Sequence, residues 1–458
     1  MNSTIPEASR YLRLALGRGQ VANDNQRRYV RIVQGISSGL LSKGVNVIVG
    51  VISVPLTVRY LGGERYGVWI TISTALAWIT LADFGMSSSL TNALSEAYAS
   101  ERNDLAQSYF ASAFWLLILV ALVLGFVFFS CWRLVDWDRV FNVETAQAQA
   151  ELAPAVAVAF VIFLLNFPFS SISKIYGAYQ EVAIANAWTA TGSVLGLLGL
   201  VVVTYLKGSL VALILAVSGA ALLTSMISAI WVFWRSKPWL IPHPARITRD
   251  AIKKLSELGG MFFVLQLAWL ALFQTDNLII AHFLGARSVT PYSVTWRLFT
   301  YASIFQLLAG SSYWPAYSEA FSRGDRAWVR HSFRINFAVT IVSTLCLAIP
   351  MVLFGQWIIG KWAGAQAVPT FGLLCLMGVW SVINAAMSSQ ACILAGTGKI
   401  KGQTIYAILA AVVNLALSIV LVQRIGLTGV ILGTVAAYAV CVFVPQWIEV
   451  ERAISYAR

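Results

Sequence analysis

Charged residues are scarce in this sequence, and most of those present are basic. Asp, Glu, Lys and Arg together make up 11% of the 458 residues, whereas an average soluble domain contains about 25%. Apolar residues account for 59% of the chain, which is more than a soluble globule of this length needs for its core. The composition therefore excludes an ordinary soluble domain and predicts an all-α integral membrane protein.

Residues that bind metals or carry redox chemistry are also few. There are five cysteines and three histidines, and their spacing matches no metal or redox motif. The cysteines lie in or beside apolar runs, so we interpret them as small buried apolar side chains. We also find no Walker loop and no Ser–His–Asp order in a polar loop. We therefore expect no metal site, no bound cofactor and no enzyme activity.

The excess of basic residues has a simple explanation in a membrane protein. The net charge of +13 would suggest nucleic acid in a soluble protein, but cytoplasmic loops retain Lys and Arg. About twelve apolar runs are each long enough for a span of about 20 residues. Their loops carry more basic residues when both termini are placed in the cytoplasm. We therefore predict a multi-pass protein of the cytoplasmic membrane that contacts lipid and binds no nucleic acid.

The spans fall into two groups of six, separated by a basic, proline-containing loop. Residues 247–259 in this region are expected to form a short amphipathic helix on the inner leaflet. The predicted segments are a basic cytoplasmic arm at 1–35, a six-helix lobe at 36–234, a cytoplasmic crossover at 235–256, a second six-helix lobe at 257–447 and a cytoplasmic tail at 448–458.

One hairpin at residues 40–98 indicates that the two halves are related. Its two apolar runs are joined at Tyr60-Leu61-Gly62-Gly63, and the second is expected to continue to about residue 90. The turn matches Phe283-Leu284-Gly285 in the second half. At the same offset, Ser95-Glu96-Ala97-Tyr98 matches Ser318-Glu319-Ala320-Phe321. This pattern is typical of transporters built from duplicated halves and predicts two pseudo-symmetric bundles.

Polar side chains form stripes at helical spacing in several of the spans. Ser42, Asn46 and Gly50 share one face of the first span, and similar stripes include Asn166 and Asn384 in the fourth and tenth spans. Hydrocarbon cannot satisfy such groups, so the stripes are expected to face inward. Close packing between helices is one explanation. A hydrated central cavity is the other, and the Lys, Asp and Asn residues favour it.

Ionisable residues at membrane depth mark the strongest candidates for function. Lys43 and Asp83 lie in the first two spans, and Asp276 and Arg297 lie in the seventh and eighth. Each Asp is expected either to pair with the neighbouring cation or to bind and release H⁺ or Na⁺. An unpaired Lys43 or Arg297 would bind an anionic substrate. Interface anchoring is the simpler role for the other three cations near the span ends: Arg59, Arg65 and Lys174.

The hairpin resembles that of bacterial lipid-linked oligosaccharide flippases. These belong to the superfamily of multidrug, oligosaccharidyl-lipid and polysaccharide exporters. The resemblance lies in Leu61-Gly62, Tyr66-Gly67-Val68-Trp69 and Leu81-Ala82-Asp83-Phe84-Gly85, and in the run from Thr275 to Ile280. It implies two six-helix bundles around a cationic cavity, alternating access, and a substrate of the undecaprenyl-diphosphate-linked oligosaccharide type. A polysaccharide polymerase and glycosyltransferases would be functional partners.

Three other functions are compatible with some of these features. The main alternative is an ion-coupled multidrug or organic cation antiporter of the same superfamily, which needs acidic and aromatic groups in its cavity. A membrane enzyme such as a glycan polymerase is disfavoured, because the longest exterior loop spans only about 133–151. A scaffold for other membrane enzymes is a further possibility. For the favoured function, the candidate substrate-binding cations are Lys43, Arg297, Arg59, Arg65 and Lys174.

Overall fold

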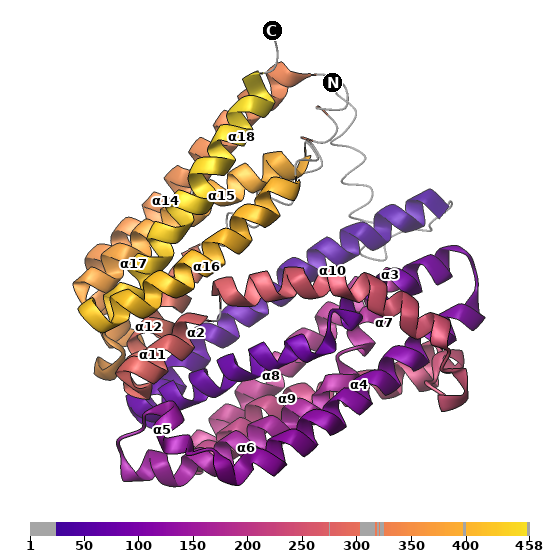
Figure 1. The fold of residues 1–458 in the computed structure, drawn as a ribbon, viewed down its shortest axis with the longest axis horizontal. Helices are drawn as coiled ribbons and strands as arrows, with labels where there is room; N and C mark the ends of the chain where they lie inside the picture. Colours follow the sequence, from indigo (N-terminus) through magenta and orange to yellow (C-terminus); the bar gives the residue numbers. More distant parts are fainter. Residues whose placement is uncertain are drawn as a thin grey trace. The chain divides into compact units, whose positions relative to one another are not determined.

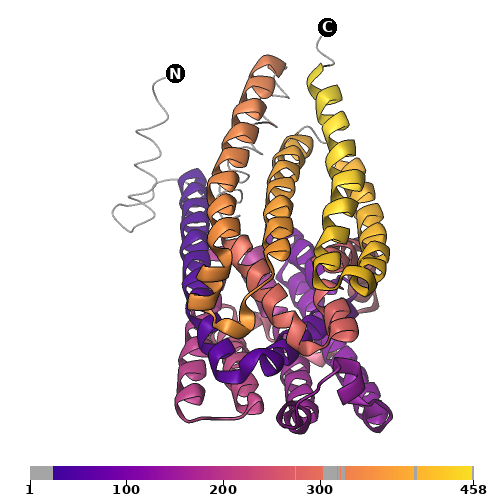
Figure 2. The ribbon, with the colours of Figure 1, turned by 90° about the vertical axis from the view of Figure 1, so that its left-hand side faces the viewer.

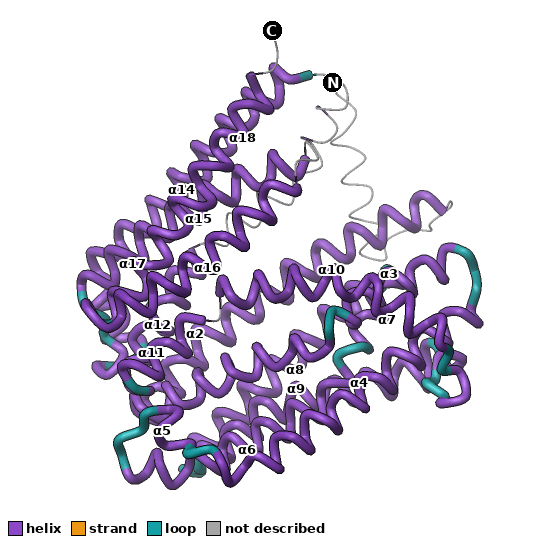
Figure 3. Tube along the Cα trace, viewed as in Figure 1, coloured by secondary structure: helices purple, strands orange, loops and turns teal. Residues whose placement is uncertain are grey.

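The computed structural model describes residues 24–273, 275–302, 317, 320, 325–396 and 400–455, and within these ranges all regular structure is helical (Figure 3). In the part of the chain that the structure describes, nine stretches are long and apolar enough to cross a membrane. The first, Leu41–Asp83, contains both passes of the hairpin. The predicted seventh span overlaps α10 (Arg249–Phe273) and α11 (Thr275–Leu284), and the described part of the predicted eighth span lies in α12 (Ala286–Ala302). The predicted all-α membrane fold with about twelve spans is therefore confirmed.

The chain divides into two compact units, each of which is described by itself. Unit 1 contains residues up to Ser53, Ile79–Val135 and Ala153–Val264, and unit 2 contains Val54–Trp78, Asp136–Leu152 and Leu265–Arg458. Residues 1–23 of the predicted arm at 1–35 lie outside the described residues, as do Ser318, Glu319 and Phe321 of the predicted repeat, while residues 24–35 of the arm are helical. The main helices are α2 (Asp24–Ile79), α3 (Met86–Ala99), α4 (Asn103–Cys131), α5 (Trp137–Phe141), α6 (Ala146–Phe169), α7 (Ile172–Ala178), α8 (Val182–Tyr205), α9 (Leu210–Trp231), α10 (Arg249–Phe273), α11 (Thr275–Leu284), α12 (Ala286–Ala302), α14 (Arg326–Trp362), α15 (Phe371–Gly396), α16 (Ile400–Ile425), α17 (Leu427–Tyr438) and α18 (Val444–Ser455) (Figure 1).

The predicted turn of the hairpin is a kink at Gly62 inside α2. Its backbone angles, φ 80° and ψ 169°, belong to a region that only glycine occupies readily. The two helical segments of α2 meet there, which ends the first pass and starts the second. Pro55 lies inside the helix just before the kink. The sequence therefore placed the break between the first two spans correctly.

The second pass does not continue as one helix to residue 90, so that part of the prediction is wrong. A 3-10 turn at Thr80–Asp83 follows α2, and Phe84 and Gly85 both have positive φ before α3 begins at Met86. A Cβ on Gly85 would lie 2.1 Å from the Gly259 carbonyl oxygen. The Asp83 carboxylate accepts the N–H groups of Gly85 and Ser87 at 2.8 and 3.3 Å. The break is thus fixed by a close backbone contact and a side-chain cap.

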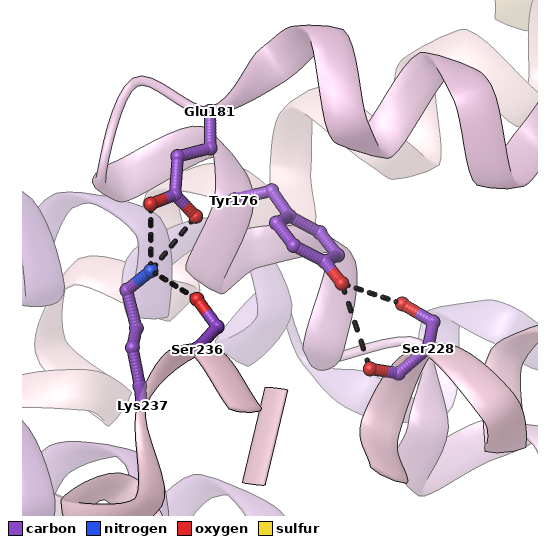
Figure 4. Close-up of polar contacts among 5 residues, drawn as sticks. All are labelled: Tyr176, Glu181, Ser228, Ser236 and Lys237. Atoms are coloured by element: carbon purple, nitrogen blue, oxygen red, sulfur yellow. Dashed lines mark hydrogen bonds and ion pairs between the residues drawn. The ribbon is translucent and has the colours of Figure 1, made fainter. Parts of the chain in front are cut away.

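The crossover after α9 is bound closely to the rest of unit 1. Figure 4 shows Lys237 donating to both carboxylate oxygens of Glu181, at 2.8 and 2.7 Å. The same ammonium lies 4.7 Å from the centre of the Tyr179 ring. Tyr176 and Ser228 share a separate buried hydrogen bond of 2.9 Å, drawn in the same view. Lys237 therefore joins the crossover to the α7–α8 turn.

The predicted short amphipathic helix at 247–259 is instead the beginning of a longer helix. Residues from Arg249 form the first turns of α10, which continues to Phe273. Lys254 donates to Glu96 of α3 at 2.9 and 2.8 Å. Because Lys254 is bound to α3, this face of the helix packs on protein.

Unit 2 is built from long helices that lie side by side. Figure 2 shows the C-terminal helices, coloured orange to yellow, running alongside one another. In this unit α14 packs on α15, α15 packs on α17, and α16 packs on α17. A Cβ on Gly433 would lie 2.8 Å from Ser418 Oγ, so α16 and α17 cross closely. This crossing brings polar residues of the two helices together inside the unit.

Candidate functional site

A polar cavity of about 420 Å³ lies within unit 2, among α11, α12 and the second segment of α2. Aromatic rings, hydroxyls, one amide, one carboxylate and one guanidinium line it. The lining includes Tyr66, Ser73, Thr74, Asp276, Asn277, Tyr292, Trp296, Arg297, Thr300 and Tyr301. Two of the sequence-predicted site residues, Asp276 and Arg297, are thus found on the wall of one cavity. Since polar groups at membrane depth are costly, this cavity is the best candidate for a functional site.

Close backbone contacts hold the walls of this cavity together. A Cβ on Gly67 would lie 1.7 Å from the Ala286 carbonyl oxygen, so only glycine fits where α2 meets α12. Thr290 Oγ1 donates a hydrogen bond to the Gly63 carbonyl. Between α11 and α12, Gly285 has φ 83°, which permits the abrupt turn. The glycines of the sequence motifs therefore position three helices around one space.

Asp276 is buried in a network of neutral partners. Its side chain is 7% exposed, and Tyr292 donates its hydroxyl hydrogen to Oδ2. Thr434 Oγ1 lies 3.5 Å from the same oxygen and 3.1 Å from Asn414 Oδ1. Oδ1 of Asp276 and Oδ1 of Asn277 accept no hydrogen bond from the described residues. These buried oxygens have unused capacity to bind a proton or a cation.

Asn414, Ser418 and Thr434 were missed by the sequence reasoning. Ser418 Oγ lies 3.0 Å from Asn414 Oδ1 and 3.2 Å from the Val430 carbonyl oxygen. Asn414 and Ser418 are four residues apart, the spacing that had identified polar stripes in other spans. The same criterion applied to the eleventh span would have found them. Only the structure shows that they lie beside Asp276.

Arg297 is exposed and lines the cavity, where it contributes a positive charge. Tyr66 and Tyr301 are its electrostatic neighbours. No ion pair between Arg297 and Asp276 exists among the described residues, because Asp276 is bonded to hydroxyl groups instead. A guanidinium in a cavity with tyrosine hydroxyls offers several donors to an anionic ligand. Its assignment to substrate binding stays a prediction.

The predicted membrane-depth charges of the first two spans, Lys43 and Asp83, lie in unit 1. Lys43 is exposed, while Asp83 is 6% exposed and caps α3 as described above. Within the described part of the chain no ion pair joins the two side chains. Asn46 Oδ1 accepts a hydrogen bond of 2.5 Å from Ser193 of α8. Nearby, Asn186 of α8 donates to Ser38 at 3.2 Å. The polar stripes of α2 and α8 therefore satisfy one another.

The remaining predicted cations and amides have different surroundings. Arg65 forms an ion pair of 2.7 Å with Glu151, and Arg59 donates to the Lys361 carbonyl, so both link segments of unit 2. Lys174 is half-buried on α7 of unit 1. Asn166 of α6 has a buried Oδ1 without a partner among the described residues. Asn384 lines a second, smaller cavity in unit 2.

Comparisons with known proteins agree on the fold. A multidrug resistance transporter of the MATE family, from the MOP superfamily and in an inward-facing conformation, matches with a TM-score of 0.74 and 13% identity, covering 93% of this chain and 99% of that one. A related MATE transporter structure in an outward-facing conformation matches with a TM-score of 0.57 and 15% identity, covering 93% and 94%. At these identities the likeness establishes a shared fold.

Two sequence relatives cover most of the chain. A Yersinia pseudotuberculosis protein named for O-antigen export is 24% identical over 88% of this chain and 91% of its own length. A protein of Salmonella typhimurium named as an O-antigen transporter is 24% identical over 89% and 93%. The sequence pattern of a family described as polysaccharide biosynthesis proteins matches residues 32–321. A match over more than half of the sequence shows that the chain belongs to the polysaccharide biosynthesis protein family.

Proposed function

We propose that this protein is a flippase that moves a lipid-diphosphate-linked oligosaccharide across the bacterial inner membrane by alternating access. The proposed cargo is the repeat unit of an O-antigen, exopolysaccharide or capsule. Family membership and relatives named for O-antigen export support this proposal. The single structural observation that carries it is the cavity of unit 2, where Arg297 has no carboxylate partner among the described residues.

The chemistry of the substrate fits that cavity. An undecaprenyl diphosphate keeps its hydrocarbon tail in lipid, while its phosphates and sugars need a polar path. A guanidinium binds phosphate oxygens through several donors at once. Arg297 is therefore the foremost candidate for the diphosphate, and the exposed Lys43 is the second. Arg59 and Arg65 are engaged with Lys361 and Glu151, so they serve first as structural links.

The buried carboxylate of Asp276 is proposed as the coupling site for Na⁺ or H⁺. Oxygen atoms of Asp276, Asn414, Thr434, Ser418 and the Val430 carbonyl are gathered there. Hard cations prefer such oxygen ligands, and Oδ1 of Asp276, which has no partner among the described residues, leaves a position for one. Binding or release of a cation at this carboxylate would link transport to an ion gradient.

The remaining parts of the proposal follow from this role. The protein is a transporter with no catalytic activity of its own, and both termini lie in the cytoplasm. Glycosyltransferases supply its cargo, and a polysaccharide polymerase consumes it. The second candidate function is an organic cation antiporter, which the MATE-like fold and the acid and aromatic groups Asp276, Tyr292 and Trp296 favour. Such groups suit a cationic ligand.

The decisive experiment uses a deletion strain that accumulates lipid-linked oligosaccharide on the inner leaflet. Wild-type protein should restore export in full, and the Arg297→Lys variant should restore it in part. The Arg297→Ala variant should not restore export. Arg334→Ala is the matched control, because Arg334 is an exposed residue of α14 that does not line the cavity. A deletion strain that exports glycan normally but becomes sensitive to cationic drugs would support the antiporter instead.

A further inference from the structure

Unit 2 contains a second cavity that shares a wall with the first. It measures about 160 Å³, and its lining includes Trp296, Thr300, Trp380, Ser381 and Asn384. Trp296 and Thr300, one turn apart on α12, also line the larger cavity that contains Arg297. The two spaces are therefore neighbours across one turn of one helix. A ligand whose charged group lies at Arg297 would extend its next chemical group toward this second space.

A row of aromatic rings fixes the position of the shared wall. Trp296 stacks on Tyr292 with ring centres 6.3 Å apart and on Trp380 at 6.0 Å. Trp380 in turn meets the edge of Tyr438 at 4.7 Å. Tyr292 is held by its hydrogen bond to Asp276. Tyr292, Trp380 and Tyr438 are buried, whereas Trp296 is half-buried. A ligand can therefore reach the ring of Trp296.

Uncharged polar groups lie around this indole. The side chain of Asn384 makes no hydrogen bond with the described residues, so its amide has donors and an acceptor to offer. Ser381 donates to the Met377 carbonyl and Thr300 to the Trp296 carbonyl, which leaves both hydroxyl oxygens as acceptors. None of the described residues that line the second cavity is charged. The described lining thus combines aromatic side chains with neutral hydrogen-bonding groups.

The geometry points to a binding subsite for one sugar ring in the second cavity, with Trp296 contacting apolar C–H groups of the ring and Asn384 binding its hydroxyls. This inference rests on the proposed flippase function, because the sugar would be the one attached to the diphosphate at Arg297. The cavity is smaller than the roughly 300–1,000 Å³ of sites for drug-sized ligands, so it suits one ring and not a whole glycan. Trp296 would then separate the phosphate site from the sugar site.

The test measures binding of defined lipid probes to the purified full-length protein in nanodiscs. One probe is a polyprenyl diphosphate without sugar, and the others carry a single glucose, galactose or N-acetylglucosamine. Wild-type protein should bind at least one sugar-bearing probe about tenfold more tightly than the bare probe, a difference of about 1.4 kcal/mol. Trp296→Ala should remove this preference, and Trp296→Phe should retain most of it.

Further variants distinguish a sugar subsite from a structural role. Asn384→Ala should weaken binding of the sugar-bearing probe a fewfold and leave the bare probe unaffected, while Arg297→Ala should weaken both. The control Trp357→Ala changes a tryptophan of α14 that is 67% exposed and lines neither cavity, and it should change nothing. Thermal unfolding of each variant checks that the fold is kept.

The possible failures are separable. If wild-type protein binds all probes with equal affinity, or if Trp296→Ala weakens the bare and sugar-bearing probes alike, the sugar subsite is overturned while the flippase proposal stands. If wild-type protein binds no polyprenyl diphosphate at all, the proposed function fails and the subsite fails with it.

Discussion

The two units use polar side chains at membrane depth in different ways. In unit 1, Asn46 binds Ser193 and Asp83 caps the backbone of α3, so these groups satisfy one another or the main chain. In unit 2, Arg297 and the Oδ1 atoms of Asp276 and Asn277 line or adjoin a cavity without partners among the described residues. A stripe of polar residues therefore does not by itself identify a binding site. A binding site is indicated where polar groups beside a cavity have hydrogen-bonding capacity that the protein does not use.

This comparison assigns different consequences to residues that look alike in the sequence. Asp83 and Asp276 are both buried acids, but Asp276 lines the cavity of unit 2, whereas Asp83 accepts hydrogen bonds from backbone N–H groups. A substitution in the satisfied network of unit 1 should reduce stability, because it leaves a buried group without its partner. A substitution in the cavity of unit 2 should reduce transport while the fold survives. The following predictions test this division, beginning with the largest effect.

The largest effect is expected at the glycine that holds the cavity walls together. Gly67→Ala would place a Cβ 1.7 Å from the Ala286 carbonyl oxygen, and backbone on both sides must then move. We expect a loss of about 3 kcal/mol or more, seen as little folded protein in size-exclusion chromatography. The control is Gly44→Ala, since a Cβ there meets nothing within 4 Å. A normally folded Gly67→Ala variant would contradict the close contact.

The two buried acids should respond in opposite ways to the same substitution. Asp276→Asn keeps the size of the side chain and its contact with Tyr292 but removes the titratable charge. We expect folded protein whose transport no longer responds to an imposed Na⁺ or H⁺ gradient, with activity reduced at least tenfold in proteoliposomes. Asp83→Asn should remain coupled to the gradient and should unfold at a lower temperature, because it weakens the cap of α3.

The reverse pattern would reject the division between the units. If Asp83→Asn uncouples transport while Asp276→Asn only lowers the unfolding temperature, the functional carboxylate lies in unit 1. In that case the exposed Lys43 would replace Arg297 as the first candidate for binding the phosphates.

The sequence predicted the all-α membrane fold, the approximate number of membrane spans and two residues of the larger cavity in unit 2, Asp276 and Arg297. Hydropathy identified the spans, because a chain that crosses hydrocarbon must form helices of apolar residues in which the backbone groups are paired. Ionisable residues are rare in such apolar runs and were therefore easy to recognise. Gly62 was recognisable as the hairpin break because few other residues fit its backbone angles. These are local properties that a linear pattern contains.

Pairings between distant residues could not be read in this way. Nothing in the sequence indicates that Asn414 and Thr434 lie beside Asp276, or that Arg65 is bound by Glu151. The break at Phe84 and Gly85 depends on the backbone of Gly259, far along the chain. Such contacts follow from how the helices pack, and helix packing is set by many small interactions at once.

A moderate effect is expected at the ion pair of the crossover. Lys237 is 8% exposed and Glu181 is 30% exposed, so Lys237→Met leaves a partly buried carboxylate without its cation. We expect a loss of roughly 1–3 kcal/mol, measured as a lower unfolding temperature with transport retained. The matched control Lys253→Met removes an exposed lysine whose distance to Glu257 is 3.9 Å, and exposed pairs contribute little. Equal effects of the two variants would show that the crossover is not held by Lys237.

The smallest effect is expected at the satisfied stripe of unit 1. Asn46→Ala removes the acceptor of the hydrogen bond from Ser193, and side-chain hydrogen bonds between membrane helices contribute about 0.6 kcal/mol on average. Because Ser193 also lies 3.0 Å from the Thr189 carbonyl oxygen, its hydroxyl keeps a partner in the variant. We therefore expect a barely lowered unfolding temperature and near-normal export in the deletion strain. Loss of export in Asn46→Ala with the fold intact would mean that this stripe contacts the cargo, and that satisfied hydrogen bonds are a poor guide to packing roles in this protein.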